Sequence, residues 1–524
     1  MACLWRAAPV GQAGRVDRQQ YVILPSRGLR SEGTAAGARR YLAGLAPRPA
    51  TALAPRLAQR SARPERPAGA LRTLGRAGDL HVIDAIGADG ARLVEATPAT
   101  IAALRAAQPG LVITRLRFYR PASWQTEIVD RLAKLRTTTG VVEVTVRTRG
   151  SGHPVAGAEV IGIVDVANSV GALGRTNAAG RTRLRLGTAT RIEQLMVFAD
   201  RGHWSLLRRN VELTGADGRV EIGLRPLTPD ATDVVTAMVR PSRQHDGAGV
   251  RVGVVDTGIS LSHPDLAVVG GLNTVVGEHD DDFGDNGDSH GTHVAGIITA
   301  TGNDGDGRSG IAPAAALYSY RVFGRKGAVA SSFAIAKAID AAVAEGCDLV
   351  NLSLGGGDTD PVLRAAIGDA RAAGTVVITA AGNDSRGVVG FPASEPIAVA
   401  VSALGRKGTY PRDSTAVLDQ LGPYGADRAD YVAAFSNVGP EIDMIGPGVA
   451  VVSTVPGGYG EMSGTSMACP AVTGLAARLI ARNPKLLRAP RDQARSDEII
   501  RRLLASGRSL GFPAEFEGRG LPGA

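Results

Sequence analysis

The chain has 524 residues with a formal net charge of +9, and 44% of its residues are hydrophobic, as in ordinary globular proteins with about three domains. Its positive charges are scattered and form no Lys/Arg block interleaved with aromatic residues, which argues against a nucleic-acid-binding protein. No stretch reaches the roughly 18 apolar residues that a membrane span requires, and no signal peptide is recognised at the N-terminus.

Residues 1–123 are predicted to form a small α+β unit. Strand-like stretches begin with "QYVIL" and continue with "LHVIDAIG", "ARLVEA" and "LVITRLRFYRP". A helix is expected in "TPATIAALRAAQPG", where Thr97 can cap the first turn and Pro98 can occupy its first position. Residues 35–77 are rich in Ala, Arg and Pro, which is typical of a loose or partly helical linker.

Residues 141–225 have a different sequence pattern, in which short stretches of alternating apolar and polar residues are separated by turns rich in Gly, Asn and Pro. Examples are "VVEVTVRTR", "HPVAGAEVIGIVD" and "QLMVFAD". This spacing predicts a β-sandwich, and the segment resembles carboxypeptidase regulatory-like or transthyretin-like modules. The following residues, 226–249, contain prolines and charged side chains and are predicted to be a flexible linker.

From residue 250 the pattern indicates an α/β domain with a doubly wound, mostly parallel sheet. Continuous apolar runs such as "VRVGVVD", "CDLVNLSLG" and "TVVITAAGN" suit strands that are buried on both faces. They alternate with the helical stretches "HGTHVAGIITA" and "SSFAIAKAIDAAVAEG". This domain is expected to span residues 250–505 and to be followed by a tail at residues 506–524.

Four polar residues fall where one cleft of such a sheet could gather them. Asp256 and Asn383 end predicted strands, while His290 and Ser466 stand at predicted helix starts. Each has a structural alternative, because Asp and Asn are common in turns and residues at helix starts can be caps. Together they offer a hydroxyl nucleophile, a base, a group that orients the base, and an amide donor.

The motifs "VVDTGI", "HGTHVAG", "NLSLG", "TAAGN" and "GTSMACP" resemble those of the subtilase family of serine peptidases, in the same Asp…His…Ser order. The resemblance implies that Ser466 is the nucleophile, His290 the general base and acid, and Asp256 the residue that holds the imidazole. It further implies that the Asn383 side chain and the backbone N–H of Ser466 stabilise the oxyanion.

The resemblance also implies where substrate binds. In this family the substrate adds as a strand beside the segment 353–356, and the segment 380–383 forms the other pocket wall. Gly390 would lie at the floor of the P1 pocket, where the missing side chain favours large apolar P1 residues. The residues expected to contact substrate are Ser353, Leu354, Gly355, Gly356, Ala380, Ala381, Gly382 and Gly390.

The loop "EHDDDFGDNGDSH" gathers many carboxylates and is a candidate for structural calcium, since Ca²⁺ takes 6–8 oxygen ligands. Family members with similar loops bind calcium, and a solvated acidic loop is the equal alternative. Asp265 in "HPDL" also resembles a calcium ligand of the family. No cofactor is required for the chemistry, and His293 is expected to be structural because "HGTH" lacks the Glu of a zincin helix. The candidate ligands are Asp280, Asp282, Asp285, Asn286 and Asp288.

The N-terminal unit resembles, through "YVILPS" and "RFYRP", the inhibitory propeptide of subtilases. The chain is therefore expected to be a serine endopeptidase that cleaves polypeptides and is made as an autoprocessed zymogen, with its own N-terminal segment as inhibitor. Activation is expected to cut within residues 225–249 and to release the sandwich together with the inhibitor. The alternative is a catalytically idle domain that serves as a scaffold for the sandwich. Residues 405–431 look like an insertion of unknown role.

Overall fold

The computed structural model describes residues 18–30, 36–45, 80–135, 137, 139–213, 218–240, 242–302, 307–325 and 327–523. These fall into two compact units, residues 1–117 and 118–524. Most of the Ala/Pro/Arg-rich segment predicted as a linker lies outside the described residues. None of the described helices is both long enough and apolar enough to cross a membrane.

The N-terminal unit is an antiparallel sheet with strand order β2-β3-β1-β4 and two helices. Its core contains Ile23 and Val94 from the strands and Ile101 and Leu104 from α2. Thr97 caps α2 by accepting a hydrogen bond from the Thr100 N–H at 3.1 Å. The elements are β1 (Gln19–Pro25), α1 (Ala36–Gly44), β2 (Leu80–Ala85), β3 (Arg92–Ala96), α2 (Pro98–Ala107) and β4 (Leu111–Arg115).

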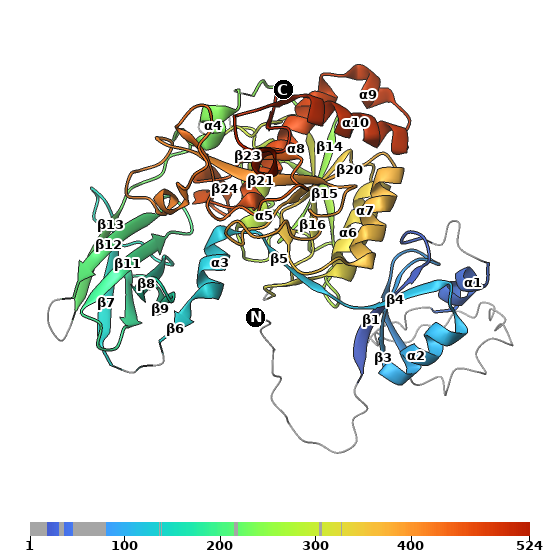
Figure 1. Cartoon of the computed structure of the whole chain (residues 1–524), viewed down its shortest axis with the longest axis horizontal. Helices are drawn as coiled ribbons and strands as arrows, with labels where there is room; N and C mark the ends of the chain where they lie inside the picture. Colours follow the sequence, from blue (N-terminus) through green and yellow to red (C-terminus); the bar gives the residue numbers. More distant parts are fainter. Residues whose placement is uncertain are drawn as a thin grey trace, which may run out of the picture. The chain divides into compact units, whose positions relative to one another are not determined.

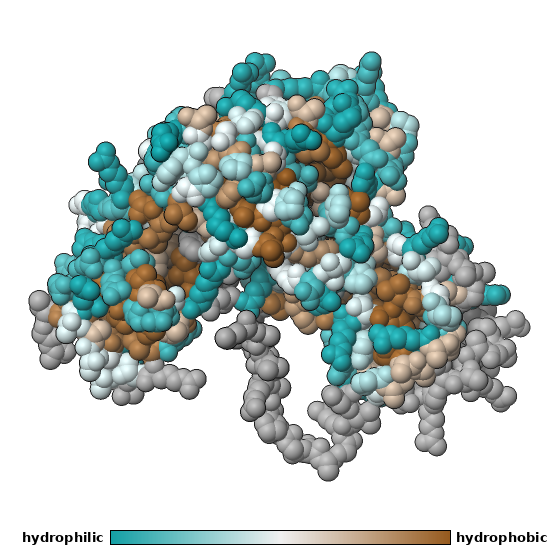
Figure 2. All heavy atoms as spheres, viewed as in Figure 1, coloured by the Kyte–Doolittle hydropathy of each residue, from teal (hydrophilic) through white to brown (hydrophobic). Residues whose placement is uncertain are grey.

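The second unit opens with the short strand β5 (Phe118–Pro121) and helix α3 (Trp124–Arg131), and the chain then builds two facing sheets (Figure 1). One sheet has the order β10-β7-β13 and the other β12-β11-β8-β9-β6. Buried apolar side chains from both sheets form one cluster between them, as expected for a β-sandwich, and Figure 2 shows apolar atoms at the surface of this part of the molecule as well. The strands are β6 (Ala133–Lys134), β7 (Val141–Thr148), β8 (Glu159–Asp165), β9 (Val170–Arg175), β10 (Arg181–Arg185), β11 (Arg191–Phe198), β12 (Leu206–Glu212) and β13 (Arg219–Leu224).

The segment predicted as a flexible linker, residues 226–249, is instead packed, so this prediction was wrong. It contains helix α4 (Val234–Met238), whose N-cap Asp233 forms a capping box with Thr236. Asp233 is fully buried, accepts a hydrogen bond from Val452 N–H at 2.9 Å and pairs with Arg308. Charges that read as solvated in the sequence are thus paired inside the protein, which holds this segment on the domain that follows.

The largest sheet has eight strands with the order β15-β16-β14-β18-β20-β21-β22, and β23 also pairs with β21. All the pairings are parallel except β21 with β22, which confirms the predicted doubly wound α/β fold. The strands are β14 (Arg251–Asp256), β15 (Val268–Asn273), β16 (Ala316–Arg321), β18 (Leu349–Leu352), β20 (Val376–Ala380), β21 (Val399–Arg406), β22 (Asp430–Val432) and β23 (Met444–Pro447).

Helices cover both faces of this sheet. Successive side chains of a strand point to opposite faces, and in β14 the side chains of Val252 and Val254 join the core cluster that contains Val472 of α8. A Cβ at the intervening Gly253 would meet Ala342 of α6 instead. The helices are α5 (His290–Thr299), α6 (Ser332–Ala344), α7 (Pro361–Ala372), α8 (Thr465–Ala481), α9 (Pro484–Arg488) and α10 (Gln493–Ala505).

The C-terminal residues 506–524, predicted as a tail, also pack on this domain. Leu510, Phe512 and Leu521 are buried in the main core cluster, and the Ile445 N–H donates to Gly520 O. The remaining elements of the domain are β17 (Ala330–Ser331), β19 (Leu354–Gly355), the 3-10 helix η2 (Thr415–Asp419), β24 (Val451–Val455), β25 (Gly458–Met462), β26 (Gly507–Arg508), α11 (Ala514–Glu517) and β27 (Leu521–Pro522).

Candidate active site

The carboxyl end of the large sheet brings Asp256 and His290 into contact. Asp256 is the last residue of β14, and His290 is the first residue of α5. The two side chains are buried, with His290 Nδ1 2.7 Å from Asp256 Oδ1. The same oxygen accepts a hydrogen bond from Thr257 N–H at 2.7 Å, which fixes the carboxylate. The arrangement leaves His290 Nε2 as the ring nitrogen that can take up a proton.

The charge of Asp256 also sets the protonation of the imidazole. Burial opposes the charged form of His290, but the charge of Asp256 and its hydrogen bond to the ring outweigh this effect. A smaller contribution comes from Asp288, whose Oδ1 accepts the backbone N–H of His290 at 2.8 Å. The pKa of His290 is therefore raised above its ordinary value.

Asn383 and Ser466 meet at the start of α8. Gly464 is the N-cap of this helix, so the helix-cap interpretation of Ser466 is wrong. Asn383 Oδ1 accepts hydrogen bonds from Thr465 N–H at 2.9 Å and Thr465 Oγ at 3.0 Å. Thr465 thus turns the Asn383 amide so that Nδ2 faces the neighbourhood of Ser466. Sequence reasoning missed Thr465, and its position directly before Ser466 was the available signal.

The Ser466 hydroxyl is buried and donates to Ser353 O at 2.9 Å. In turn Ser353 Oγ donates to Ser466 O at 2.9 Å, so two hydrogen bonds join the segment at Ser353 to the start of α8. His290 Nε2 is buried and has no hydrogen-bond partner within the described parts of the chain. The hydroxyl therefore has to rotate away from Ser353 before it can donate to that nitrogen.

The segment β5 of the chain itself lies where a substrate strand was expected. It pairs antiparallel with β19, where Leu354 faces Pro121 and Gly355 faces Arg120. On its other side it pairs antiparallel with β17, where Ala330 faces Tyr119. Main-chain pairing of this kind is β-augmentation, and it fills the groove from both sides. The β17 wall was missed from sequence, because a strand of two residues carries no periodic signal.

Ala122, which follows β5, presents its carbonyl oxygen to Asn383 and Ser466. Asn383 Nδ2 donates to Ala122 O at 2.5 Å, and the Ser466 N–H donates to the same oxygen at 3.4 Å. Ala122 N–H donates to Ser353 O at 3.1 Å. Two donors on one carbonyl oxygen next to a hydroxyl form the geometry of an oxyanion site around the Ala122–Ser123 peptide bond.

The other residues expected to bind substrate lie around this carbonyl. Gly390 N–H donates to Ala381 O at 3.0 Å, and Gly356 N–H donates to Phe391 O at 3.0 Å. A Cβ built on Gly390 would stand 3.7 Å from Ala381 O and 3.9 Å from Gly356 N, between the two expected walls. The structure therefore brings together the segments containing Ser353, Leu354, Gly355, Gly356, Ala380, Ala381, Gly382 and Gly390.

The acidic loop expected to bind calcium is arranged in a different way. Asp282 pairs with Arg325 at 2.7 Å and with Arg321 at 3.4 Å. Asn286 donates through Nδ2 to Phe323 O and Gly324 O, which turns its amide nitrogen towards that segment. Among the described residues, no three His, Cys, Asp or Glu side chains gather as a metal would require. Calcium binding by Asp280, Asp282, Asp285, Asn286 and Asp288 stays a prediction, because calcium also takes backbone and Asn oxygens that such a cluster does not include.

Asp265, the other calcium candidate, lies inside the protein. Its carboxylate is fully buried, and Oδ2 accepts from Tyr459 Oη at 2.6 Å and from Arg308 N–H at 3.1 Å. Oδ1 is buried without a hydrogen-bond partner in the part of the chain that the structure describes. His293 is buried on α5 with Nε2 3.1 Å from Val451 O, and burial lowers its pKa to about 3, as suits a structural histidine.

Comparison with known proteins agrees with this geometry. The model of the subtilase family matches residues 247–506. Subtilisin DY of Bacillus licheniformis is 36% identical over 282 residues, covering 53% of this chain and 90% of that protein. Subtilisin of Bacillus pumilus is 38% identical over 261 residues, covering 49% and 86%. Alkaline elastase YaB of Bacillus sp. (strain YaB) is 38% identical over 265 residues, covering 50% and 63%. The chain therefore belongs to the subtilase family and is a subtilisin-like serine endopeptidase.

Proposed function

We propose that Asp256, His290 and Ser466 act as the catalytic triad, with Asn383 Nδ2 and the Ser466 N–H as oxyanion donors. The observation that supports this most is the Ala122 carbonyl oxygen, which accepts hydrogen bonds from both donors. A peptide carbonyl bound in this way is polarised for attack. A catalytically idle scaffold does not need a peptide bond placed beside a hydroxyl, a buried imidazole and two aligned hydrogen-bond donors. This arrangement therefore favours the enzyme over the scaffold.

The reaction follows from these positions. Ser466 Oγ attacks the carbonyl carbon while its proton passes to His290 Nε2, and the negative charge gathers on the oxygen held by Asn383 and Ser466 N–H. Asp256 stabilises the imidazolium through Nδ1. His290 then gives the proton to the leaving amine as the C–N bond breaks. Water repeats the sequence on the acyl-enzyme and releases the new carboxylate.

We propose that the chain is a zymogen that cuts itself between Ala122 and Ser123. β5 occupies the substrate groove as its central strand, so the segment acts as an intramolecular inhibitor until it leaves. The cut expected from sequence within residues 225–249 is replaced by this one, because α4 and the buried Asp233 hold that segment against the core.

We also propose that the P1 pocket accepts large apolar side chains. Gly390 leaves open space between Ala381 and Gly356, with only ordinary contact distances around an added Cβ. Ala122, the residue that precedes the proposed cut, is small and does not fill a pocket of that size. The main-chain pairing of β5 with β17 and β19 positions Ala122 without a side chain that fills the pocket.

The identity of the nucleophile is tested with a serine-directed phosphonate on the self-processed enzyme. The adduct is expected on Ser466, and Ser466→Ala should show no labelling and roughly a 10⁶-fold loss of kcat, the loss known for the relative subtilisin. Ser463→Ala is the matched control, because Ser463 Oγ accepts a hydrogen bond from Ala450 N–H and bonds to none of the proposed catalytic groups among the described residues, and it should label normally. An adduct elsewhere, or none once the N-terminal segment has been removed, would contradict the proposal.

The acid limb of kcat/KM should report the raised pKa of His290. Activity is expected to fall as the pH drops below that pKa, because the imidazolium cannot accept the serine proton. Asp288→Asn removes a negative charge that raises this pKa but keeps an oxygen for the His290 N–H. The acid limb should therefore move to lower pH, while Asp285→Asn should leave it in place. The pH dependence of kcat/KM is measured with a peptidyl p-nitroanilide. An acid limb at the same pH in Asp288→Asn as in the wild type would contradict the assignment of this limb to His290.

Filling the space at Gly390 tests the P1 pocket. Gly390→Val should lower kcat/KM for substrates with P1 Phe or Leu by about tenfold or more, since even one methylene in a pocket is worth roughly that much. Hydrolysis after P1 Ala should change little. Gly368→Ala on α7 is the control, because its added Cβ meets only Ile397 at 3.7 Å. If Gly390→Val lowered kcat/KM equally for all P1 residues, the assignment of Gly390 to the P1 pocket would be wrong.

We propose that Asp265, and not the acidic loop, is the residue to test for structural calcium. If its unpaired Oδ1 binds calcium, excess chelator should lower the melting temperature by roughly 5 °C. Asp265→Asn should abolish this chelator effect, whereas Asp285→Asn should retain it. If excess chelator leaves the melting temperature of the wild type unchanged, Asp265 binds no calcium.

A further inference from the structure

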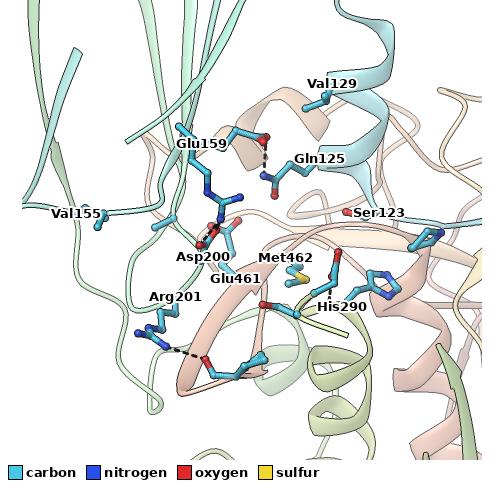
Figure 3. A pocket seen from close by; sticks show the side chains of 18 residues that line it. Ser123, Gln125, Val129, Val155, Glu159, Asp200, Arg201, His290, Glu461 and Met462 are labelled. Atoms are coloured by element: carbon cyan, nitrogen blue, oxygen red, sulfur yellow. Dashed lines mark hydrogen bonds and ion pairs between the residues drawn. The ribbon is translucent and has the colours of Figure 1, made fainter. Parts of the chain in front are cut away.

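A cavity of about 600 Å³ lies beside His290, on the side of the proposed cut that carries the leaving amine (Figure 3). The volume is within the range of substrate and ligand pockets. Catalytic-domain residues such as Met462 form one wall, and the first turn of α3 forms another. The third wall comes from the sandwich, through Glu159 of β8 and the loop at Asp200 and Arg201. The match to the subtilase family begins at residue 247, after the sandwich, so this wall is an addition to the matched domain.

The sandwich is held to the catalytic domain through the hairpin β24–β25. Gly202 N–H donates to Tyr459 O at 2.7 Å, and Arg201 Nη1 donates to Pro456 O at 3.1 Å. Ser205 N–H donates to the half-buried carboxylate of Glu461 at 2.7 Å. These hydrogen bonds connect the sandwich to the catalytic domain at this hairpin.

The insertion at residues 405–431 holds the sandwich from a second side. Leu207 N–H donates to Asp413 O at 2.7 Å, and Arg149 pairs with the Asp413 side chain at 2.9 Å. Val417 and Leu418 of η2 pack against the apolar cluster on the outer face of the five-stranded sheet. The insertion, whose role the sequence left open, therefore forms part of the domain interface.

We propose that the sandwich remains part of the mature enzyme and forms the leaving side of the substrate site, where Glu159 selects a basic residue at P3′. P3′ denotes the third residue after the cleaved bond. This inference rests on the proposed function and deepens it, because it names a specificity residue for the same reaction. A cut between Ala122 and Ser123 leaves the sandwich on the catalytic domain, as the interface requires.

The chain's own sequence marks the position. With the cut after Ala122, the third residue on the leaving side is Gln125, and Gln125 Nε2 donates to Glu159 Oε1 at 3.0 Å. When residues 123–125 give way to a substrate, its third residue on that side would face the Glu159 carboxylate. A Lys or Arg there could replace the neutral amide with a charge-assisted hydrogen bond.

The charges around the cavity favour a basic side chain there. Arg175 is paired with Asp200 at 2.6 Å, and Arg201 is turned towards Pro456 O. Glu159 forms no ion pair within the described residues, since Arg175, which stands opposite it in the β8–β9 ladder, is paired with Asp200 instead. The charged side chains lining the cavity, apart from His290, are acidic at Glu159, Asp200, Asp288 and Glu461 and basic at Arg175 and Arg201.

The test uses the self-processed enzyme and quenched peptides with the sequence FYRPASW followed by Lys, Gln or Glu. The wild type should cleave the Lys peptide about fivefold more efficiently than the Glu peptide, the size expected for a partly exposed ion pair. Glu159→Gln should bring the two rates together within about twofold. Glu221→Gln on β13, which does not line the cavity, should keep the wild-type ratio. The mass of the active species should include the sandwich.

A p-nitroanilide with the sequence FYRPA reports folding, because it has no residue on the leaving side. All three proteins should cleave it equally well. An unchanged Lys-to-Glu ratio in Glu159→Gln, no preference in the wild type, or an active species without the sandwich would overturn the inference. Failure of the wild type to cleave the p-nitroanilide would instead contradict the proposed function.

Discussion

The organisation of the second unit depends on the pairing of β5 between β17 and β19. This pairing carries the chain across the carboxyl end of the large sheet and sets the Ala122 carbonyl oxygen 2.5 Å from Asn383 Nδ2. In the proposed function this pairing selects the Ala122–Ser123 peptide bond for cleavage, because the Ala122 carbonyl oxygen reaches both donors. We propose that this segment is both the inhibitor and the first substrate.

The pairing also explains why the sandwich lies where it does. α3 begins directly after the selected peptide bond, and Ile128 and Val129 pack on the outer face of the five-stranded sheet. At its other end the sandwich is followed by α4, which the buried Asp233 ties to Val452 and Arg308. Two anchored ends and the contacts of residues 405–431 hold the sandwich on the catalytic domain, and the proposed leaving side of the substrate site depends on this attachment.

The sequence allowed the large sheet and the placement of Asp256, His290, Asn383 and Ser466 to be predicted, because buried parallel strands are long apolar runs and polar residues at their ends stand out. Features that depend on contacts across the fold could not be found in this way. Thr465 orients Asn383, and β17 pairs with β5, but neither carries a periodic pattern. Residues 226–249 looked solvated because the sequence does not show that Asp233 meets Arg308 inside the protein. The arginine partners of the acidic loop could not be predicted for the same reason, since they are about 40 residues away in the chain.

The central claim is that the chain's own Ala122–Ser123 bond is the first substrate of the site. The most direct measurement is the N-terminal sequence of the species that accumulates when the purified protein processes itself, with Ser466→Ala as the uncut reference. The account predicts a new N-terminus at Ser123, formed at a first-order rate that does not depend on protein concentration. A new N-terminus within residues 225–249, or the same cut appearing in Ser466→Ala, would contradict it.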